Sequence, residues 1–383
     1  MHDLRILITC GGGPGVWGLL HALRRLPGRR AHLIAADADP DATLGTALAD
    51  EGLRLPRADQ AEYATALRTA CRRLRVDVLI PVIDAELETV AGLAAELGAA
   101  GTRVLLPPAA VVRRCADKWL THEALAESGL LPRHRLVRTV EETAAAIRAL
   151  GYPRVRLCAR PTRGAGGRGF HLIDARGEDF EGRMHAKPGP PRMTAEDFVA
   201  LRADGPREYP LILSEFVEGP ELGHDVLAER GRVIARVTRR KGGSQLGGNW
   251  TRIDFDDDPR HEPWVARVAE GLELDGLVSI DAIEPAGDPR AAPRLLEVNA
   301  RPGAYIGMSC TRLHLLAWGI DRLMGDEPID DERYVAPRAG RCGSALRVLA
   351  DVGLNDEGGF VLDPAPAGSE VEHADPVSCR APG

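Results

Sequence analysis

Three polar side chains alternate with apolar ones near the C-terminal end of the chain. Glu297, Asn299 and Arg301 are separated by Val298 and Ala300, and Leu296 precedes them. Residues two apart on a strand point to the same face of a sheet. We therefore expect Leu296 and Val298 on a buried face, and a carboxylate, an amide oxygen and a guanidinium in a row on the other.

This row of side chains predicts a site for magnesium and phosphate. Asp281, at the end of the strand-like run 277–282, could add a second carboxylate from a neighbouring strand. Mg²⁺ usually takes one or two carboxylates together with substrate phosphates, and an arginine beside them could bind phosphate through two hydrogen bonds. The alternative is a half-buried strand with a polar face, since such alternation is common on strands.

The composition is that of an ordinary globular protein with room for two or three structural units. The 383 residues are 44% hydrophobic and 27% charged, and the net charge of −7 argues against a nucleic-acid binder. The seven cysteines are scattered without a C-x-x-C pair, which indicates reduced thiols and a cytoplasmic location. No apolar run has the length of a membrane helix, so we expect neither a nucleic-acid nor a membrane partner.

Strands and helices alternate over the first hundred residues, which predicts a parallel, Rossmann-like α/β unit. Its first turn reads Gly13-x-Gly15-x-x-Gly18 and is followed by Asp37, which formally fits the dinucleotide fingerprint. A lone match of this kind is weak, so the alternative is a glycine-rich turn in a domain that does not bind NAD. Asp84 and Glu86 follow the third predicted strand, at the end where α/β sheets bind ligands, but we favour helix capping as the role of Asp84.

A second glycine-rich loop lies between two predicted strands, 154–160 and 170–173. It contains Gly164, Gly166, Gly167 and Gly169 beside Arg163 and Arg168. Glycines let backbone N–H groups approach a phosphate closely, and the arginines supply charge. We favour a mobile flap over phosphates above the alternative of a flexible hairpin loop.

Three further segments carry candidate groups, each with a plainer alternative. Lys118 begins a predicted helix and could reach a phosphate, although a helix lysine is usually solvated. The turn 215–221 could offer backbone groups to an adenine and a carboxylate to a ribose, or could be a turn with surface acids. The cations at 239–241 end a strand, where they could meet an anionic substrate or solvent.

The order of these motifs resembles the ATP-grasp superfamily over about residues 1–325. It is most similar to the carboxylate–amine ligases related to the large subunit of carbamoyl-phosphate synthetase. The resemblance implies an α/β chain in which an ATP-grasp fold follows a Rossmann-like pre-ATP-grasp domain. The expected division is 1–108 for that domain, 109–150 for linker helices, 151–214 for the flap subdomain, 215–330 for the catalytic subdomain and 331–383 for an extension with a disordered end.

The resemblance also implies a role for each matched residue. Lys118 and Arg160 would contact the ATP phosphates; most families have lysine at the second position, but the carbamoyl-phosphate synthetase branch has arginine. The flap over the phosphates would use Arg163, Gly164, Gly166, Gly167 and Arg168. Glu215 and the backbone of Val217 would meet adenine, and Glu221 the ribose. Asp281, Glu297 and Asn299 would hold one or two Mg²⁺ or Mn²⁺ ions, Arg301 would face the γ-phosphate, and Arg239 and Lys241 would bind the acceptor carboxylate.

The expected activity is ATP-dependent ligation of a carboxylate to an amine through an acyl phosphate, with release of ADP and phosphate. Amino-acid-like substrates in a biosynthetic pathway follow from the family, in which homodimers are common. The alternatives are a phosphotransferase that forms a carbamoyl or acyl phosphate, a non-catalytic nucleotide-binding protein, and an NAD oxidoreductase. Segments 175–210 and 331–383 are expected to shape the substrate pocket.

Overall fold

The computed structural model describes residues 3–164, 166–176, 191–246, 249–288, 290–325, 331–335, 343–346, 353–354 and 360–361. Residues 1–347 form one structural unit and 348–383 a second. In the second unit the structure describes the antiparallel pair β17 (Gly353–Leu354) and β18 (Phe360–Val361). Our expectations for the end of the chain, and for residues 177–190 of the predicted insertion, lie outside the described residues.

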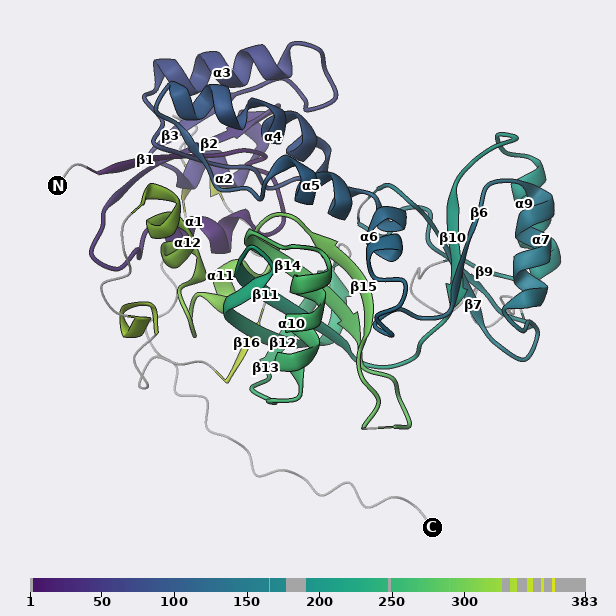
Figure 1. Ribbon diagram of the computed structural model, residues 1–383. Helices are drawn as coiled ribbons and strands as arrows, with labels where there is room; N and C mark the ends of the chain where they lie inside the picture. Colours follow the sequence, from purple (N-terminus) through teal and green to yellow (C-terminus); the bar gives the residue numbers. More distant parts are fainter. Residues whose placement is uncertain are drawn as a thin grey trace. The chain divides into compact units, whose positions relative to one another are not determined.

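The N-terminal part is a parallel five-stranded sheet in the order β3-β2-β1-β4-β5 (Figure 1). Its strands are β1 (Leu4–Ile8), β2 (Ala31–Asp37), β3 (Glu51–Arg54), β4 (Val78–Ile80) and β5 (Arg103–Val104). Its helices are α1 (Val16–Leu23), α2 (Leu44–Leu48), α3 (Tyr63–Arg73) and α4 (Asp84–Ala99), with a 3₁₀ turn at Pro40–Ala42. This confirms the predicted parallel α/β unit. We missed β3, because this short strand has alternate half-buried and exposed residues and includes a glycine.

Successive residues of β1 point to opposite faces of this sheet and bury both. Ile6 and Ile8 pack with α1 and with α12 (Leu315–Met324), whereas Leu7 packs with α3 and α4. A central parallel strand covered on both sides has to be apolar throughout. The run Leu4–Ile8 is apolar apart from Arg5 for this reason.

A second five-stranded sheet has the order β6-β10-β7-β8-β9. Its strands are β6 (His134–Val137), β7 (Leu157–Pro161), β8 (His171–Ile173), β9 (Arg192–Met193) and β10 (Leu211–Glu215). Helices α7 (Val140–Ala149) and α9 (Ala195–Ala203) pack together on one face of it (Figure 1). The range 109–150, which we expected to hold linker helices, contains helices and also the strand β6, which pairs with β10. The strand has only four residues, of which the first two are polar, so it has no apolar run by which it could be predicted.

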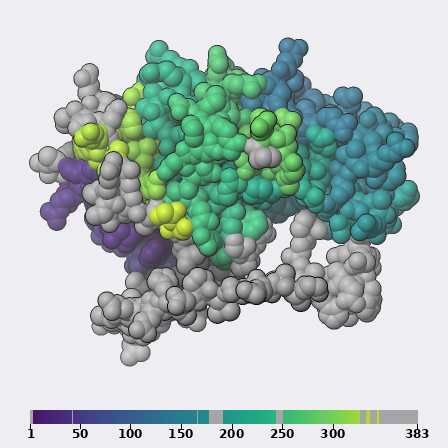
Figure 2. Space-filling model, turned by 90° about the horizontal axis from the view of Figure 1, so that it is seen from below, coloured from purple at the N-terminus to yellow at the C-terminus, as the bar shows by residue number. Residues whose placement is uncertain are grey.

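The third sheet is antiparallel throughout and has the order β15-β14-β11-β12-β13-β16. Its strands are β11 (Glu221–Glu229), β12 (Arg232–Leu246), β13 (Asn249–Phe255), β14 (Gly276–Ile283), β15 (Arg294–Asn299) and β16 (Ser344–Leu346). Helix α10 (His261–Gly271) covers one face through Trp264 and Val268, and α12 covers the other. The segments from β11 to β15 form a continuous green surface in the space-filling view (Figure 2).

The remaining helices connect these sheets. They are α5 (Ala109–Ala116), α6 (Lys118–Ala124), α11 (Ile306–Ser309) and the 3₁₀ turn Asp331–Tyr334. Asp117 caps α6, because its carboxylate accepts a hydrogen bond from the backbone N–H of Trp119 at 2.9 Å. No helix in the described part of the chain is both long and apolar enough to cross a membrane.

Candidate active site

Two strands of the third sheet bring the three predicted metal ligands together. Asp281 on β14 lies directly opposite Glu297 on β15, and the next pair on the same face of the ladder is Ser279 with Asn299. The Asp281 and Glu297 side chains retain 18% and 34% of their accessible surface. The two carboxylates, and the Asn299 amide two residues farther along β15, are thus partly accessible.

A bulge corrects the simple alternation that we predicted for β15. The register shifts so that Asp281 faces Glu297 whereas Ala282 faces Leu295, which leaves Leu296 as the extra residue. Leu295 and Val298 are buried, and Leu296 is only half-buried. The prediction that Leu296 lies on the buried face is therefore wrong, because one inserted residue changes the face of every residue on one side of it.

Two lysines face the carboxylate pair. The Lys241 ammonium lies 2.7 Å from Asp281 and 3.4 Å from Glu221, and the Lys118 ammonium lies 3.8 Å from Glu297. Burial disfavours the charge on Lys241, but the carboxylates of Asp281 and Glu221 outweigh burial and raise the pKa of Lys241. Burial, with the neighbouring Asp281 charge, raises the pKa of Glu297. The pair therefore sits where negative charge is costly and a cation stabilises it.

Arg160 connects the second sheet to the bulge in β15. Its Nη1 donates to the Leu296 carbonyl at 2.6 Å, and its Nη2 lies 3.2 Å from Nε2 of His122. Burial and the Arg160 charge lower the pKa of His122 to about 2. The imidazole is therefore neutral near pH 7, and its Nε2 accepts the hydrogen bond from Arg160. Sequence reasoning missed His122, because a lone histidine on a helix gives no signal.

Acidification is expected to weaken the fold through His122. In the unfolded chain this histidine binds a proton near its ordinary pKa of about 6.5, whereas in the folded protein it stays neutral. Its contribution is therefore present above about pH 6.5 and falls as pH drops, by at most about 1.4 kcal/mol per pH unit. Urea unfolding from about pH 7 to about pH 5 should show a shallower dependence in His122→Gln, which keeps an acceptor for Arg160 and cannot titrate. Equal slopes for both proteins would contradict this assignment.

The second glycine-rich loop is fixed at its first residues. Lys118 donates from its ammonium to the Gly164 carbonyl at 2.6 Å, and from its backbone N–H to the Thr162 carbonyl at 2.8 Å. Arg163 lies 2.7 Å from Glu88 of α4 and 3.2 Å from Asp117. These ion pairs engage Arg163 in anchoring the loop. Farther along, Gly164, Gly166 and Gly167 are exposed and have positive φ angles, and Arg168 is also exposed.

The residues predicted to surround adenine and ribose lie near the end of β10 and the start of β11. Glu215 accepts hydrogen bonds from Nε and the backbone N–H of Arg133, at 2.7 and 3.1 Å. Val217 is half-buried in the turn that follows. Glu221 accepts from the Trp250 indole N–H at 3.1 Å besides facing Lys241. Their predicted nucleotide contacts stay predictions.

The three cations at the end of a predicted strand lie in different environments. Arg239 is 1% exposed, pairs with Asp225 at 2.7 Å and lies 5.2 Å from the centre of the Tyr305 ring. Arg240 joins Asp256 and Glu284, and only Lys241 reaches the carboxylate pair of β14 and β15. The predicted contact of Arg239 with an acceptor carboxylate is not favoured by this burial.

Arg301 forms a two-point ion pair with Asp84, the first residue of α4. Nε and Nη2 of Arg301 lie 3.1 and 2.7 Å from the two carboxylate oxygens. Our expectation that Asp84 caps the helix is wrong, because Ile83 occupies the cap position and Asp84 is the first helical residue. Glu86 accepts hydrogen bonds from the backbone N–H groups of Val82 and Ile83, at 2.9 and 3.1 Å. The sequence did contain a signal for the ion pairs that Asp84 and Glu88 form with arginines. These two acids are four residues apart after a parallel strand, which places them on one face of a helix.

The glycines of the dinucleotide-like fingerprint serve helix packing. A Cβ on Gly15 would lie 2.6 Å from the Cα of Ala304, and Gly18 faces Gly307 of α11. The backbone after Arg301 therefore occupies the space in front of these glycines. This arrangement leaves no room beside Gly15 and Gly18 for the pyrophosphate of a dinucleotide, and it disfavours the NAD alternative.

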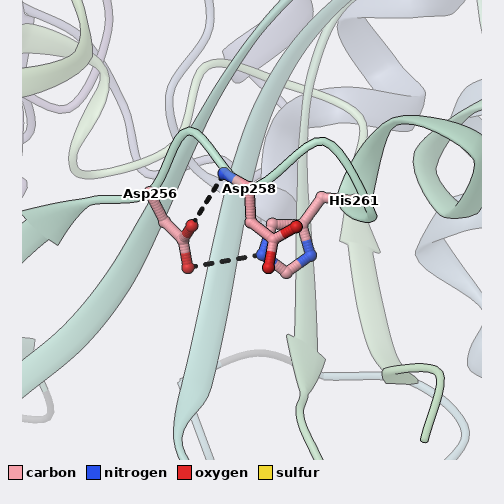
Figure 3. A group of neighbouring side chains, drawn as sticks. All are labelled: Asp256, Asp258 and His261. Atoms are coloured by element: carbon pink, nitrogen blue, oxygen red, sulfur yellow. Dashed lines mark hydrogen bonds and ion pairs between the residues drawn. The ribbon is translucent and has the colours of Figure 1, made fainter. Parts of the chain in front are cut away.

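A separate group of side chains, Asp256, Asp258 and His261, has ligand atoms within 4.8 Å of one another (Figure 3). His261 Nε2 lies 3.3 Å from Asp256, and the backbone N–H of Asp258 donates to Asp256 at 3.0 Å. Arg240 pairs with Asp256, and Arg260 pairs with Asp258. Because arginines already neutralise both carboxylates, this cluster fixes the β13–α10 turn and is a poor cation site.

Two family models match the chain. The model described as ATP-grasp in the biosynthetic pathway with Ter operon matches residues 207–340, and the PylC-like N-terminal domain matches residues 6–105. These matches and the three sheets confirm the resemblance that the motif order suggested. The chain therefore carries an ATP-grasp domain, which follows a PylC-like N-terminal domain.

Solved structures with the same fold come from proteins with different activities, and some of them contain bound nucleotides. A biotin carboxylase–β,γ-ATP complex from Campylobacter jejuni is 16% identical, with a TM-score of 0.63, over 88% of this chain and 74% of that chain. The biotin carboxylase domain dimer of Hydrogenobacter thermophilus 2-oxoglutarate carboxylase, with MgADP and bicarbonate, is 16% identical, with a TM-score of 0.62, over 88% of this chain and 73% of that chain. An L-amino acid ligase from Bacillus licheniformis is 15% identical, with a TM-score of 0.59, over 87% of this chain and 77% of that chain. At these identities the likeness establishes the fold.

Proposed function

We propose that the protein is an ATP-dependent carboxylate–amine ligase that forms an amide or peptide bond through an acyl phosphate. The observation that carries this proposal is the facing pair Asp281 and Glu297, with Lys118, Arg160 and Arg301 around it. A carboxylate pair ringed by cations from separate elements suits a metal–triphosphate and an acyl phosphate. The ATP-grasp family description and the fold shared with an L-amino acid ligase support amino-acid-like substrates in a biosynthetic pathway.

The residues present fit a magnesium ion. Asp281, Glu297 and Asn299 offer only oxygen ligands from adjoining strand positions, and the raised pKa of Glu297 reflects burial beside a second carboxylate. When bound there, Mg²⁺ would neutralise charge on the phosphates and orient them. Mn²⁺ takes similar oxygen ligands.

The proposed chemistry needs no nucleophile from the protein. A carboxylate oxygen of the acid forms a bond to the γ-phosphorus of ATP, and the bond from that phosphorus to the ADP oxygen breaks. The amine nitrogen then bonds to the acyl carbon, loses a proton to solvent, and displaces phosphate, which keeps one oxygen of the acid. Burial, with the charges of Asp37 and Glu86, raises the pKa of Cys10 to about 11. This thiol is therefore protonated near neutral pH, which agrees with direct transfer.

The side chains contribute orientation and charge in this scheme. Lys118 and Arg160 would hold the phosphates, and Arg301 would face the γ-phosphoryl group as its charge shifts to the acid. The loop 164–168 would cover the intermediate and exclude water, with Lys118 holding the start of the loop. Glu215, Val217 and Glu221 would line the nucleoside end. Lys241 is the better placed of the two proposed anchors for the acid.

Release of ADP from MgATP with amino acids, singly and in pairs, tests this proposal. We expect ADP to require two partners, together with a product whose mass equals their sum minus water. ADP formed from one acid without any amine would favour the phosphotransferase. Nucleotide binding without ADP from any pair would favour a non-catalytic nucleotide-binding protein.

The quaternary structure and the limits of the subdomains are also proposals. A homodimer is supported by the dimer of the Hydrogenobacter biotin carboxylase domain. The division at 108, 150, 214 and 330 needs one adjustment, because β6 and α7 contribute to the sheet and the covering layer of the flap subdomain. Mass measurement of the native protein would establish the number of subunits.

A further inference from the structure

We infer that Asp84 of the N-terminal domain is a positioning residue that turns Arg301 so that its free edge meets the transferred phosphate. This inference rests on the proposed function, because it assigns Arg301 to the γ-phosphoryl group. Asp84 would act through Arg301 and would not touch the substrate. The N-terminal domain would thus set the orientation of a group in the nucleotide site.

The hydrogen-bond pattern of Arg301 indicates which edge is free. A guanidinium carries five N–H donors in a rigid planar fork. Nε and Nη2 share one edge, and both donate to Asp84, at 3.1 and 2.7 Å. Nη1 makes a longer hydrogen bond of 3.3 Å to the Pro302 carbonyl. One hydrogen on each of Nη1 and Nη2 remains without a partner among the described residues, and together they form an edge that matches two oxygens of a phosphate.

Asp84 is itself rigidly held. The two residues before it, Val82 and Ile83, both donate their backbone N–H groups to the buried carboxylate of Glu86. Glu86 also accepts hydrogen bonds from Thr9 of the β1 end, at 2.6 Å, and from Tyr63 of α3. The first turn of α4 is therefore tied to β1 and α3, and it offers Arg301 a fixed carboxylate.

The backbone after Arg301 is fixed from the same domain. Gly15 and Gly18, at the start of α1 and in its first turn, pack directly on Ala304 and Gly307. Arg301 thus has its side chain paired with α4 and the following residues packed on α1. The negative charge of Asp84 also contributes to the pKa values of Lys118 and Glu297, in the raising direction for both. The Asp84–Arg301 pair therefore lies near the carboxylate pair of the sheet.

The test compares nucleotide affinities, which need no turnover. Arg301 oriented toward a γ-phosphate should make the protein bind Mg²⁺–AMPPNP more tightly than Mg²⁺–ADP. We expect Asp84→Asn to lower this preference about tenfold, since an amide cannot make the two-point ionic contact. Arg301→Met should lower it by at least as much, and adding Asp84→Asn to Arg301→Met should change it no further. Glu96→Gln, an exposed ion-paired carboxylate on the same helix, is the matched control and should leave the preference unchanged.

Each contrary result has a distinct meaning. A preference that is unchanged or increased in Asp84→Asn overturns the inference, and so does an additive loss in the double variant, because Asp84 then acts independently of Arg301. A wild-type protein that binds neither nucleotide overturns the proposed function itself. Thermal unfolding accompanies each variant, and Asp84→Ser replaces Asp84→Asn if the latter does not fold.

Discussion

Replacement of Glu297 by glutamine is expected to reduce ADP formation from MgATP by at least about 100-fold, because loss of a metal ligand removes several kcal/mol of charge stabilisation. Glutamine keeps the size of the side chain but removes the charge that faces Asp281 across the β14–β15 ladder. Lys118, 3.8 Å away, would also lose its nearest carboxylate. Steady-state ADP release over a range of Mg²⁺ concentrations measures the effect, and the activity of the variant should need more Mg²⁺.

The matched control for this experiment is Glu127→Gln, which removes a carboxylate from an exposed position. It should leave both the rate and the Mg²⁺ requirement unchanged. A Glu297→Gln protein with wild-type turnover at low Mg²⁺ would show that the facing carboxylates hold no metal that the reaction needs. Its folding should be preserved, because the charge removed lies in a costly position.

Gly307→Ala is expected to destabilise the protein by about 1–3 kcal/mol, the range for overpacking in a close contact. A Cβ on Gly307 would overlap the backbone of Gly18, where α11 packs on α1. The helices would have to separate, and the segment that follows Arg301 would shift with α11. Urea unfolding gives the change in the free energy of unfolding, and ADP release should fall with it.

Gly92→Ala is the control for this substitution, because Gly92 lies within α4 and its Cβ would meet nothing within 4 Å. Alanine there should raise the free energy of unfolding by about 0.5–1 kcal/mol, since glycine is unfavourable inside a helix. Equal effects of the two substitutions would mean that the α1–α11 contact does not fix the end of the nucleotide site.

The motif order was sufficient to predict the ATP-grasp fold, and the strand pattern was sufficient to predict Asp281 and Glu297 on neighbouring strands, although not the register that sets them opposite each other. The first prediction depends on a resemblance in the order of the motifs, and the second on apolar runs and the twofold repeat of strands, which the sequence displays directly. The short strands β3 and β6 escaped prediction because half-exposed edge strands have no continuous apolar run. The bulge at Leu296 escaped because the extra residue is of the same type as the buried Leu295 before it.

The contacts of the N-terminal domain with the site could not be read from the sequence. Asp84 and Arg301 are 217 positions apart, and their pairing depends on how α4 meets the third sheet. The fingerprint glycines Gly15 and Gly18 suggested a cofactor turn, whereas the structure uses them for close helix packing. A glycine signals close approach of some group, but sequence alone does not show whether that group is a phosphate or another backbone.

Transfer of an acid oxygen to phosphate tests the central claim most directly. The acid that supports ADP formation would be labelled with ¹⁸O in its carboxylate, and the phosphate released in the complete reaction would be analysed by mass spectrometry. An acyl phosphate intermediate predicts one labelled oxygen in the phosphate for each ADP formed, and one remaining in the amide. Phosphate without label, in a reaction that still yields the amide, would contradict the proposed carboxylate–amine ligase mechanism.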